Sequence, residues 1–175
     1  MLISMVASLA QSGVGIKGGL NLANVGGDMK GTDMRPGIHV GFFASTPLAG
    51  NFGFQPELLY SQQGYKVSDE NKALYHYLAV PVIFKFSIIE GLHLQAGPQF
   101  SYLLSARRRV DNTIHVETES FNRFDAAVAL GLGYDFSNLQ VSARYNLGIS
   151  DTREANAKGV SYPNNVLQFS LGVRL

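Results

Sequence analysis

The sequence of 175 residues contains no cysteine and no tryptophan. The lack of cysteine excludes disulfide bonds, thiolate catalysis and cysteine-ligated metals, and it is compatible with an oxidising compartment. The formal net charge is +1, so the chain has no strong basic field of the kind that attracts nucleic acid. No apolar run reaches the roughly 18 residues of a transmembrane helix. Long stretches of helical periodicity are also absent, which argues against an α/β enzyme.

The sequence instead shows a regular alternation of apolar and other residues. The segment LQFSLGVRL (residues 167–175) is an example, and no charged residue falls on its apolar face. A period of two is typical of β-strands with one apolar side. Eight segments have this pattern: residues 14–22, 38–44, 52–60, 78–86, 92–104, 124–134, 139–149 and 167–175.

The connections between these segments alternate between long and short. Long polar connections at 24–35, 66–72, 107–120 and 151–165 alternate with short ones around Ala49-Gly50, Glu90-Gly91 and Ser137-Asn138. An up-and-down antiparallel arrangement brings all the long connections to one end, as in outer-membrane barrels. We therefore predict an all-β fold, an eight-stranded antiparallel up-and-down barrel formed as one domain by residues 11–175.

The apolar face of this barrel is predicted to contact lipid, with a polar, filled lumen. In lipid every backbone polar group must be paired within the protein, which a closed barrel achieves. A soluble ligand carrier would have the reverse arrangement, with an apolar lumen and a wet exterior. An eight-stranded barrel is narrow enough for side chains to fill it. The predicted polar network of the lumen consists of Lys17, Glu57, Lys85, Gln99, Asp125 and Arg144.

Two charge pairs are predicted inside the lumen, since buried ions need partners. Folding the third and fourth strands about residue 71 places Glu57 level with Lys85, which predicts a salt bridge between them. Small neighbours at Gly131 and Gly172 leave room for Arg144 to reach a carboxylate, and Glu57 is the preferred partner. We interpret the network as a structural plug. A gated ion path is the alternative.

Pro56, Pro81 and Pro98 fall inside predicted strands, where each removes one hydrogen-bond donor. We expect local bulges or missing ladder bonds at these positions. The alternation continues in phase across all three, so any bulge must be compensated nearby.

The first ten residues, MLISMVASLA, resemble the apolar core and small-residue cleavage site of a secretory signal. We interpret residues 1–10 as a signal-peptide remnant. The alternative is a short buried amino-terminal segment.

Several stretches resemble the PorT-like outer-membrane β-barrel proteins of Bacteroidetes-type bacteria. They are GGLN (18–21), QPELLYSQQG (55–64), YLAVPV (77–82), AGPQ (96–99) and RYNLG (144–148). The second is the most specific, because proline is unusual within a strand. The resemblance covers almost the whole chain. It implies an eight-stranded barrel in the bacterial outer membrane, usually without an assigned biochemical role.

Three adjacent arginines, Arg107, Arg108 and Arg109, stand out in a predicted long loop. At the outer interface they would bind lipopolysaccharide phosphates. The alternative is a solvated loop, balanced by its own acids Asp111, Glu117 and Glu119.

The catalytic candidates are weak. The histidines His39, His76, His93 and His115 lack the spacing of a metal site, and His39 and His93 are interpreted as lumen filler. His76 with Ser61 on the adjacent strand is the one constellation that suggests a lipid A-modifying enzyme. The letters GVGIKG at 13–18 match a dinucleotide motif without its strand-to-helix context.

We predict a protein that is not an enzyme and has no cofactor or metal. Its expected role is structural or interactive, through exposed loops that face outward. The alternatives are a narrow ion or small-solute channel and, less favoured, a lipid A-modifying enzyme. The expected partners are outer-membrane lipid, lipopolysaccharide and a protein at the long loops. We expect no nucleic acid and a monomeric state.

Overall fold

The computed structural model describes residues 13–25, 33–66, 72–110, 113–116, 123–150 and 163–175. Within these ranges it has nine strands. The first five are β1 (Gly13–Val25), β2 (Asp33–Pro47), β3 (Phe52–Lys66), β4 (Lys72–Ser87) and β5 (Leu92–Val110). The others are β6 (Thr113–Val116), β7 (Phe124–Phe136), β8 (Leu139–Gly148) and β9 (Asn164–Arg174). The described residues contain no helix that is long and apolar enough to cross a membrane.

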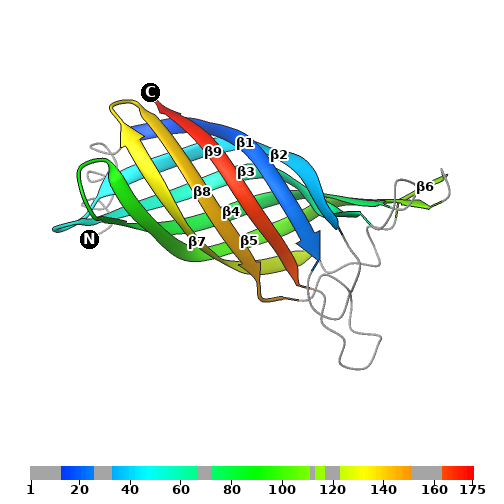
Figure 1. The fold of residues 1–175 in the computed structure, drawn as a ribbon. Helices are drawn as coiled ribbons and strands as arrows, with labels where there is room; N and C mark the ends of the chain where they lie inside the picture. The colour runs from blue at the N-terminus through cyan, green and yellow to red at the C-terminus, as the bar shows by residue number, and fades with distance from the viewer. Residues whose placement is uncertain (1–12, 26–32, 67–71, 111–112, 117–122, 151–162) are drawn as a thin grey trace, which may run out of the picture.

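The strands form one antiparallel sheet that closes on itself (Figure 1). Their order is β4-β3-β2-β1-β9-β8-β7-β5-β6, and the additional pairing of β4 with β5 closes the eight strands other than β6 into a barrel. The predicted eight-stranded antiparallel barrel is thus confirmed. Closure leaves the barrel strands with no free edge, as a lipid environment requires.

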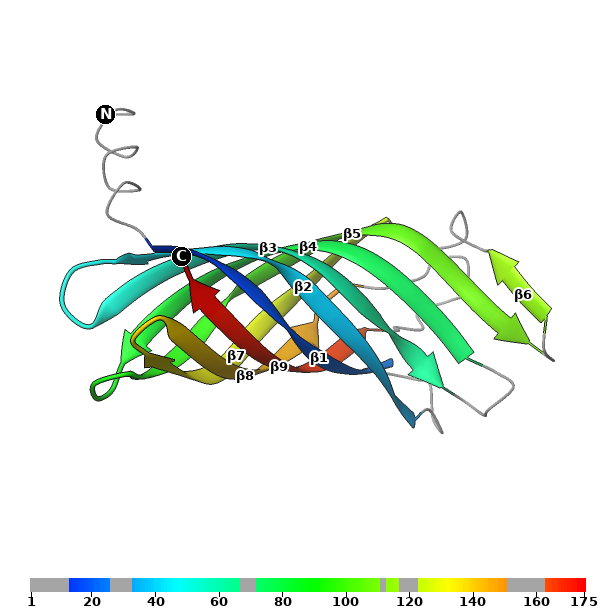
Figure 2. The ribbon, with the colours of Figure 1, turned by 90° about the horizontal axis from the view of Figure 1, so that it is seen from above.

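β6 is the element that the sequence pattern did not predict. It pairs with the end of β5, from Arg107↔Val116 to Val110↔Thr113, inside the third predicted loop. β5 pairs with β7 from Leu92 to Tyr102, so it changes partner along its length. The hairpin of β5 and β6 projects beyond the other strands at one end of the barrel (Figures 1 and 2).

The two faces of the barrel wall follow the predicted phase. Apolar side chains such as Leu20, Leu130 and Phe169 point outward and are exposed, whereas Lys17 and Arg144 are buried inside. This distribution is the inverse of a water-soluble protein and is the one that hydrocarbon stabilises. The exterior is therefore the lipid-facing surface.

The two ends of the barrel differ in how the strands are connected. Tight turns join β2 to β3, β4 to β5, and β7 to β8, and we call this the short-turn end. Gly50 (φ +66°) and Gly91 (φ +80°) have the left-handed backbone that such turns require. The opposite end, where β1 finishes and β2 begins, is called the long-loop end.

β3 and β4 continue further toward the long-loop end than the alternation predicted. β3 reaches Lys66 rather than residue 60, and β4 begins at Lys72 rather than residue 78. The inward residues there include Tyr65, Tyr75 and Tyr77, which are themselves largely apolar. The two faces are mixed here, because Gln62 and His76 face outward while tyrosines face inward. The contrast between an apolar and a polar face, which identifies a strand, therefore disappears.

The three prolines interrupt the hydrogen-bond ladder without changing its register. The β3–β4 pairing runs to Pro56↔Val82 and resumes at Leu59↔Ala79 in the same register. Likewise, the β4–β5 pairing stops at Pro81↔Gln99 and resumes at Phe84↔Ala96, with Pro98 inside the gap. The expectation of missing bonds is confirmed, and no compensating bulge is needed at these positions.

Candidate functional site: the polar lumen

All six residues of the predicted polar network lie inside the barrel. Lys17, Glu57, Lys85, Gln99, Asp125 and Arg144 are each at most 9% exposed. They are positioned by strand periodicity, since every second residue of a barrel wall points toward the axis. Their burial inside the wall places charge where it must be paired.

Glu57 is the centre of this network. Arg144 Nη1 donates to Glu57 Oε2 at 2.9 Å, and Arg144 Nη2 donates to Oε1 at 2.6 Å. Lys17 Nζ donates to the same Oε1 at 2.6 Å. The remaining guanidinium nitrogen, Arg144 Nε, donates to Gln95 Oε1 at 2.5 Å. The predicted pairing of Arg144 with Glu57 is confirmed, and it is bidentate.

The network joins opposite walls of the barrel. In the strand order β3 lies four places from β8, and β1 lies four places from β5. Four places is half of an eight-stranded circle, so Glu57 and Arg144 approach the axis from opposite sides. Lys17 and Gln95 do the same from the other two walls. Four long polar side chains therefore meet at the axis.

The predicted salt bridge between Glu57 and Lys85 is wrong. Lys85 Nζ instead contacts Asp135 Oδ2 at 3.3 Å. The reason is the register, because Lys85 lies opposite Gly53 rather than opposite Glu57. The hairpin of β3 and β4 is centred near residue 69, since Lys66 pairs with Lys72, and not near residue 71. This difference moves Lys85 toward the short-turn end.

Asp135 anchors a second ionic unit that sequence reasoning missed. Its Oδ2 also accepts from Arg174 Nη2 at 2.6 Å, and its Oδ1 accepts from Gln140 Nε2 at 2.8 Å. Asp135 is inward-facing by the period of β7, so the alternation contained the signal for it. The predicted strand stopped at residue 134, which left this residue unassigned.

Two glutamines connect the two ionic units. Gln55 and Gln140 exchange side-chain hydrogen bonds of 3.0 and 3.1 Å across the lumen. Gln55 Nε2 also donates to Glu57 Oε1 at 2.6 Å. A continuous chain of polar contacts thus runs from Asp135 to Arg144. All its members are hydrogen-bonded, and all except the partly exposed Asp135 are buried, as a low-dielectric interior requires.

Toward the long-loop end, neutral polar groups fill the lumen. His39 Nδ1 lies 2.9 Å from Asn21 Oδ1, and His39 Nε2 lies 2.9 Å from Ser170 Oγ. Asn21 Nδ2 donates to Ser61 Oγ at 3.0 Å. His93, near the short-turn end, is also buried and lies 3.2 Å from the Gly91 carbonyl. Both histidines are therefore packed inside the lumen.

The Ser61 and His76 constellation is not assembled. Ser61 is buried and faces the lumen, where it contacts Asn21. His76 lies between the inward residues Tyr75 and Tyr77 on β4 and therefore faces outward, where its Nδ1 bonds the Tyr60 hydroxyl. The two side chains lie on opposite faces of the wall, so this pair cannot form a nucleophile and base.

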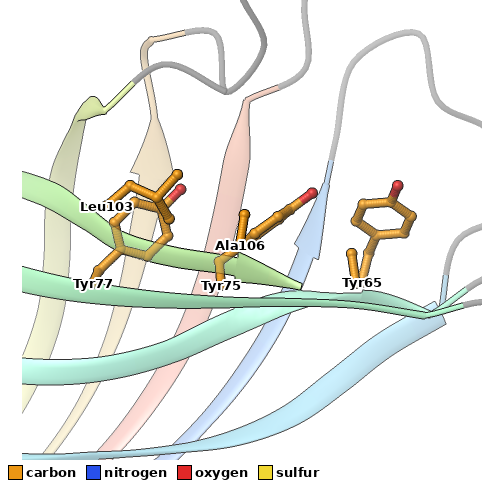
Figure 3. Close-up of a cluster of buried hydrophobic side chains, with 6 residues drawn as sticks. Tyr65, Tyr75, Tyr77, Leu103 and Ala106 are labelled. Carbon is orange, nitrogen blue, oxygen red and sulfur yellow. The ribbon is translucent and has the colours of Figure 1, made fainter. Parts of the chain in front are cut away.

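An apolar cluster lines the inside of the barrel at the long-loop end (Figure 3). It consists of Tyr65, Ala73, Tyr75, Tyr77, Leu103 and Ala106. The ring centroids of Tyr65 and Tyr75 are 6.3 Å apart, as are those of Tyr75 and Tyr77. These distances are within the range of favourable aromatic contacts. The lumen is thus polar at its centre and aromatic toward this end.

The remaining predicted lumen residues take separate positions. Gln99 Nε2 lies 3.5 Å from Ser101 Oγ, and Asp125 accepts a hydrogen bond from Ser150. Neither residue contacts the Glu57 network through the described hydrogen bonds. The prediction of a single network of six residues is therefore too broad, since the structure divides them into separate groups.

Arg107, Arg108 and Arg109 lie in β5 rather than in a loop. They extend the strand past the barrel and pair with β6 on one side and β4 on the other. Arg107 is exposed. The acids that were predicted to balance them, Asp111, Glu117 and Glu119, lie outside the described residues, as do residues 1–10.

No group of histidine, cysteine, aspartate or glutamate in the described residues has the arrangement of a metal site. The charged groups are held by one another and by glutamine amides. The arrangement can fix strands relative to one another across the lumen. The exposed face can contact lipid, and the long-loop end carries the basic extension of β5.

A closed barrel with an apolar exterior and a polar interior defines a transmembrane protein of the bacterial outer membrane. The chain belongs to the family described as "Outer membrane protein beta-barrel domain", which it matches over residues 9–154. The sequence matches none of the curated proteins.

Two solved structures illustrate the similarity in fold. Neisserial surface protein A (NspA) is similar with a TM-score of 0.65 and 12% identity, over 94% of this chain and 99% of that one. Ail, the attachment invasion locus protein of Yersinia pestis, is similar with a TM-score of 0.57 and 16% identity, over 93% and 97%. At these low identities, the similarity shows a shared fold and nothing more.

Proposed function

We propose that this protein is a sealed outer-membrane barrel with a structural or interaction role at its long-loop end. Its lumen is closed by polar side chains and does not conduct. The observation that carries the proposal is the contact of Arg144 with Glu57 across the barrel, together with Lys17 and Gln95 from the other two walls. Side chains that meet at the axis from four sides leave little space for a hydrated ion.

The energetics also favour a permanent plug. Glu57 accepts from Lys17, Gln55 and Arg144, so moving it away would leave buried cations without their carboxylate. Breaking a buried pair costs about 3–5 kcal/mol. A conformation with an open lumen would have to break these pairs, so it would rarely be populated. This favours a structural plug over a gated ion path.

Planar-bilayer recording of the refolded barrel tests this proposal. We expect no discrete current steps from the wild-type chain. A Glu57→Ala variant removes the central acceptor and is expected to leak, while Glu90→Ala in a short turn serves as the matched control. Regular steps from the wild-type chain would instead support the channel alternative.

The interaction role is proposed to include binding of lipopolysaccharide phosphates by Arg107, Arg108 and Arg109. Arg107 is exposed on the part of β5 that projects beyond the barrel. On the same wall, His76 pairs across the strands with Gln62 and with Ser105, which lies two residues before Arg107. Arginine suits phosphate because its guanidinium offers paired donors. Ail has been crystallised with the heparin analogue sucrose octasulfate, a highly anionic ligand.

A binding assay with lipopolysaccharide vesicles tests the arginine proposal. The triple variant Arg107→Ala, Arg108→Ala, Arg109→Ala is expected to bind at least tenfold more weakly than the wild-type chain. The control is Arg123→Ala, which removes an exposed cation outside the run of three arginines. Equal binding by the triple variant and the wild-type chain would eliminate the proposed phosphate contact.

Within its family, we propose that the chain is PorT-like, monomeric and without catalytic activity. The QPELLYSQQG segment supports the first assignment, because it supplies both the interrupted ladder at Pro56 and the central acceptor Glu57. A protein partner at the long loops is also proposed. Light scattering of the refolded barrel tests the monomeric state, and mass spectrometry of lipid A after expression tests the absence of lipid modification.

A further inference from the structure

A cavity of about 500 Å³ lies at the short-turn end of the barrel. Its charged lining residues are Lys85, Asp135 and Arg174, and Ser45 and Ser137 add hydroxyl groups. We call this cavity the vestibule. It adjoins the turns that face the periplasm in barrels of this kind. Its volume lies within the roughly 300–1,000 Å³ of small-molecule sites.

Asp135 is the one carboxylate among the residues that line the vestibule, and both of its oxygens already accept hydrogen bonds. Asp135 Oδ2 accepts from Lys85 and from Arg174, while Oδ1 accepts from Gln140. Two cations thus share one anionic oxygen. Arg174 Nε is buried and has no hydrogen-bond partner among the described residues. A buried N–H group without a hydrogen-bond partner destabilises the folded protein, and an acceptor that binds it removes this cost.

The charge excess continues deeper in the lumen. Glu57 is shared by Lys17 and Arg144 in the same way, and Gln55 and Gln140 join the two units. In these two units, four cationic side chains share two carboxylates. Buried charge without a counter-charge is costly in a low-dielectric interior. An anion that enters from the short-turn end would offset this excess.

We propose that the vestibule binds a small solute carrying a carboxylate or phosphate group, with Arg174 and Lys85 as its cationic contacts. The guanidinium of Arg174 offers planar, paired donors that match such oxyanions. The hydroxyls of Ser45 and Ser137 supply further hydrogen bonds. The site lies on the periplasmic side of the Glu57 network, so it is independent of whether the lumen conducts.

Titration of the refolded barrel in detergent tests this proposal. Inorganic phosphate and acetate are added separately at constant ionic strength, with chloride as the background anion. Nuclear magnetic resonance follows the Arg174 Nε–H and the backbone amides of residues 135–138. We expect a saturable shift with phosphate, acetate or both, and the two arms identify which oxyanion is preferred.

Variants locate the binding. Arg174→Gln is expected to weaken the saturable binding at least tenfold, and Lys85→Gln provides a second test from another strand. Arg123→Gln, which removes a cation at the opposite end, is the matched control and should bind like the wild-type chain. Heat-modified gel mobility verifies that each variant is folded. Linear, unsaturable shifts, or full binding by both folded vestibule variants, would overturn the proposal.

Discussion

Arg144 on β8 and Glu57 on β3 meet across the barrel axis through two hydrogen bonds of 2.9 and 2.6 Å. The paired geometry matches the planar fork of the guanidinium to the two carboxylate oxygens, which makes it both strong and directional. The two strands are on opposite walls and do not pair through their backbones. This contact therefore restrains the cross-section of the barrel in a way that the strand ladders alone do not.

Replacing Glu57 with glutamine should destabilise the barrel strongly. The amide keeps the volume and removes the negative charge, so Lys17 and Arg144 lose their shared carboxylate. We expect a loss of about 3–5 kcal/mol in the free energy of unfolding, measured by urea titration in detergent. Glu90→Gln in an exposed turn is the control and should change little. An unaltered midpoint for Glu57→Gln would contradict the central role of this carboxylate.

A double-mutant cycle should distinguish the observed partner of Lys85 from the one expected from the sequence. Lys85→Met combined with Asp135→Asn should give a coupling free energy above about 0.5 kcal/mol, because the two side chains are in contact. Lys85→Met combined with Glu57→Gln should give a smaller coupling, since the register separates them. The measurement is urea unfolding of all variants under identical conditions. Larger coupling in the second cycle would argue against the register found here.

Gly131 provides the space that Arg144 occupies. The two residues are paired across β7 and β8, and a Cβ atom at Gly131 would lie 2.8 Å from Arg144 Cγ and closer still to the Ala143 carbonyl oxygen. Gly131→Ala should cost about 1–3 kcal/mol through this overlap. Gly53→Ala is the matched control, because its nearest neighbour would lie at an ordinary 3.5 Å. Equal stability of the two variants in thermal unfolding would mean that the wall adjusts freely.

Charge on the lipid-facing surface should be tolerated according to depth. Leu130 is at the midpoint of β7 and is exposed, whereas Phe136 is at the end of the same strand. Leu130→Arg should cost about 2–4 kcal/mol in a bilayer, and Phe136→Arg about 0–1 kcal/mol. Folding titrations into phospholipid vesicles measure both. Similar costs at the two positions would indicate that the exterior is not immersed in hydrocarbon as proposed.

The fold could be predicted from the sequence because the alternation of apolar and polar residues is a local property of each strand. Alternation such as that of residues 167–175 depends on which face each side chain takes, and the faces are sorted by lipid and by the lumen. The same evidence failed where apolar and polar residues are mixed on the two faces, as around Tyr75 and Tyr77, which face inward with His76 between them on the outward face. It also gave no sign of β6, whose four residues are too few for a period to be recognised.

By itself the sequence determined the eight strands of the barrel, the lipid-facing side and the inward direction of five charged residues, although it left Asp135 unassigned. It also indicated that Arg144 has room to reach Glu57, because Gly131 lies opposite it on β7. The prediction that Gly172 is its second small neighbour is wrong, since Gln168 lies opposite Arg144 on β9 and Gly172 pairs with Gln140. Tertiary structure alone decided that Lys85 pairs with Asp135, that Lys17 joins Glu57, and that Ser61 and His76 lie on opposite faces. The reason is physical: alternation fixes a side chain's direction, whereas its partner depends on strand register and on which walls face each other across the axis.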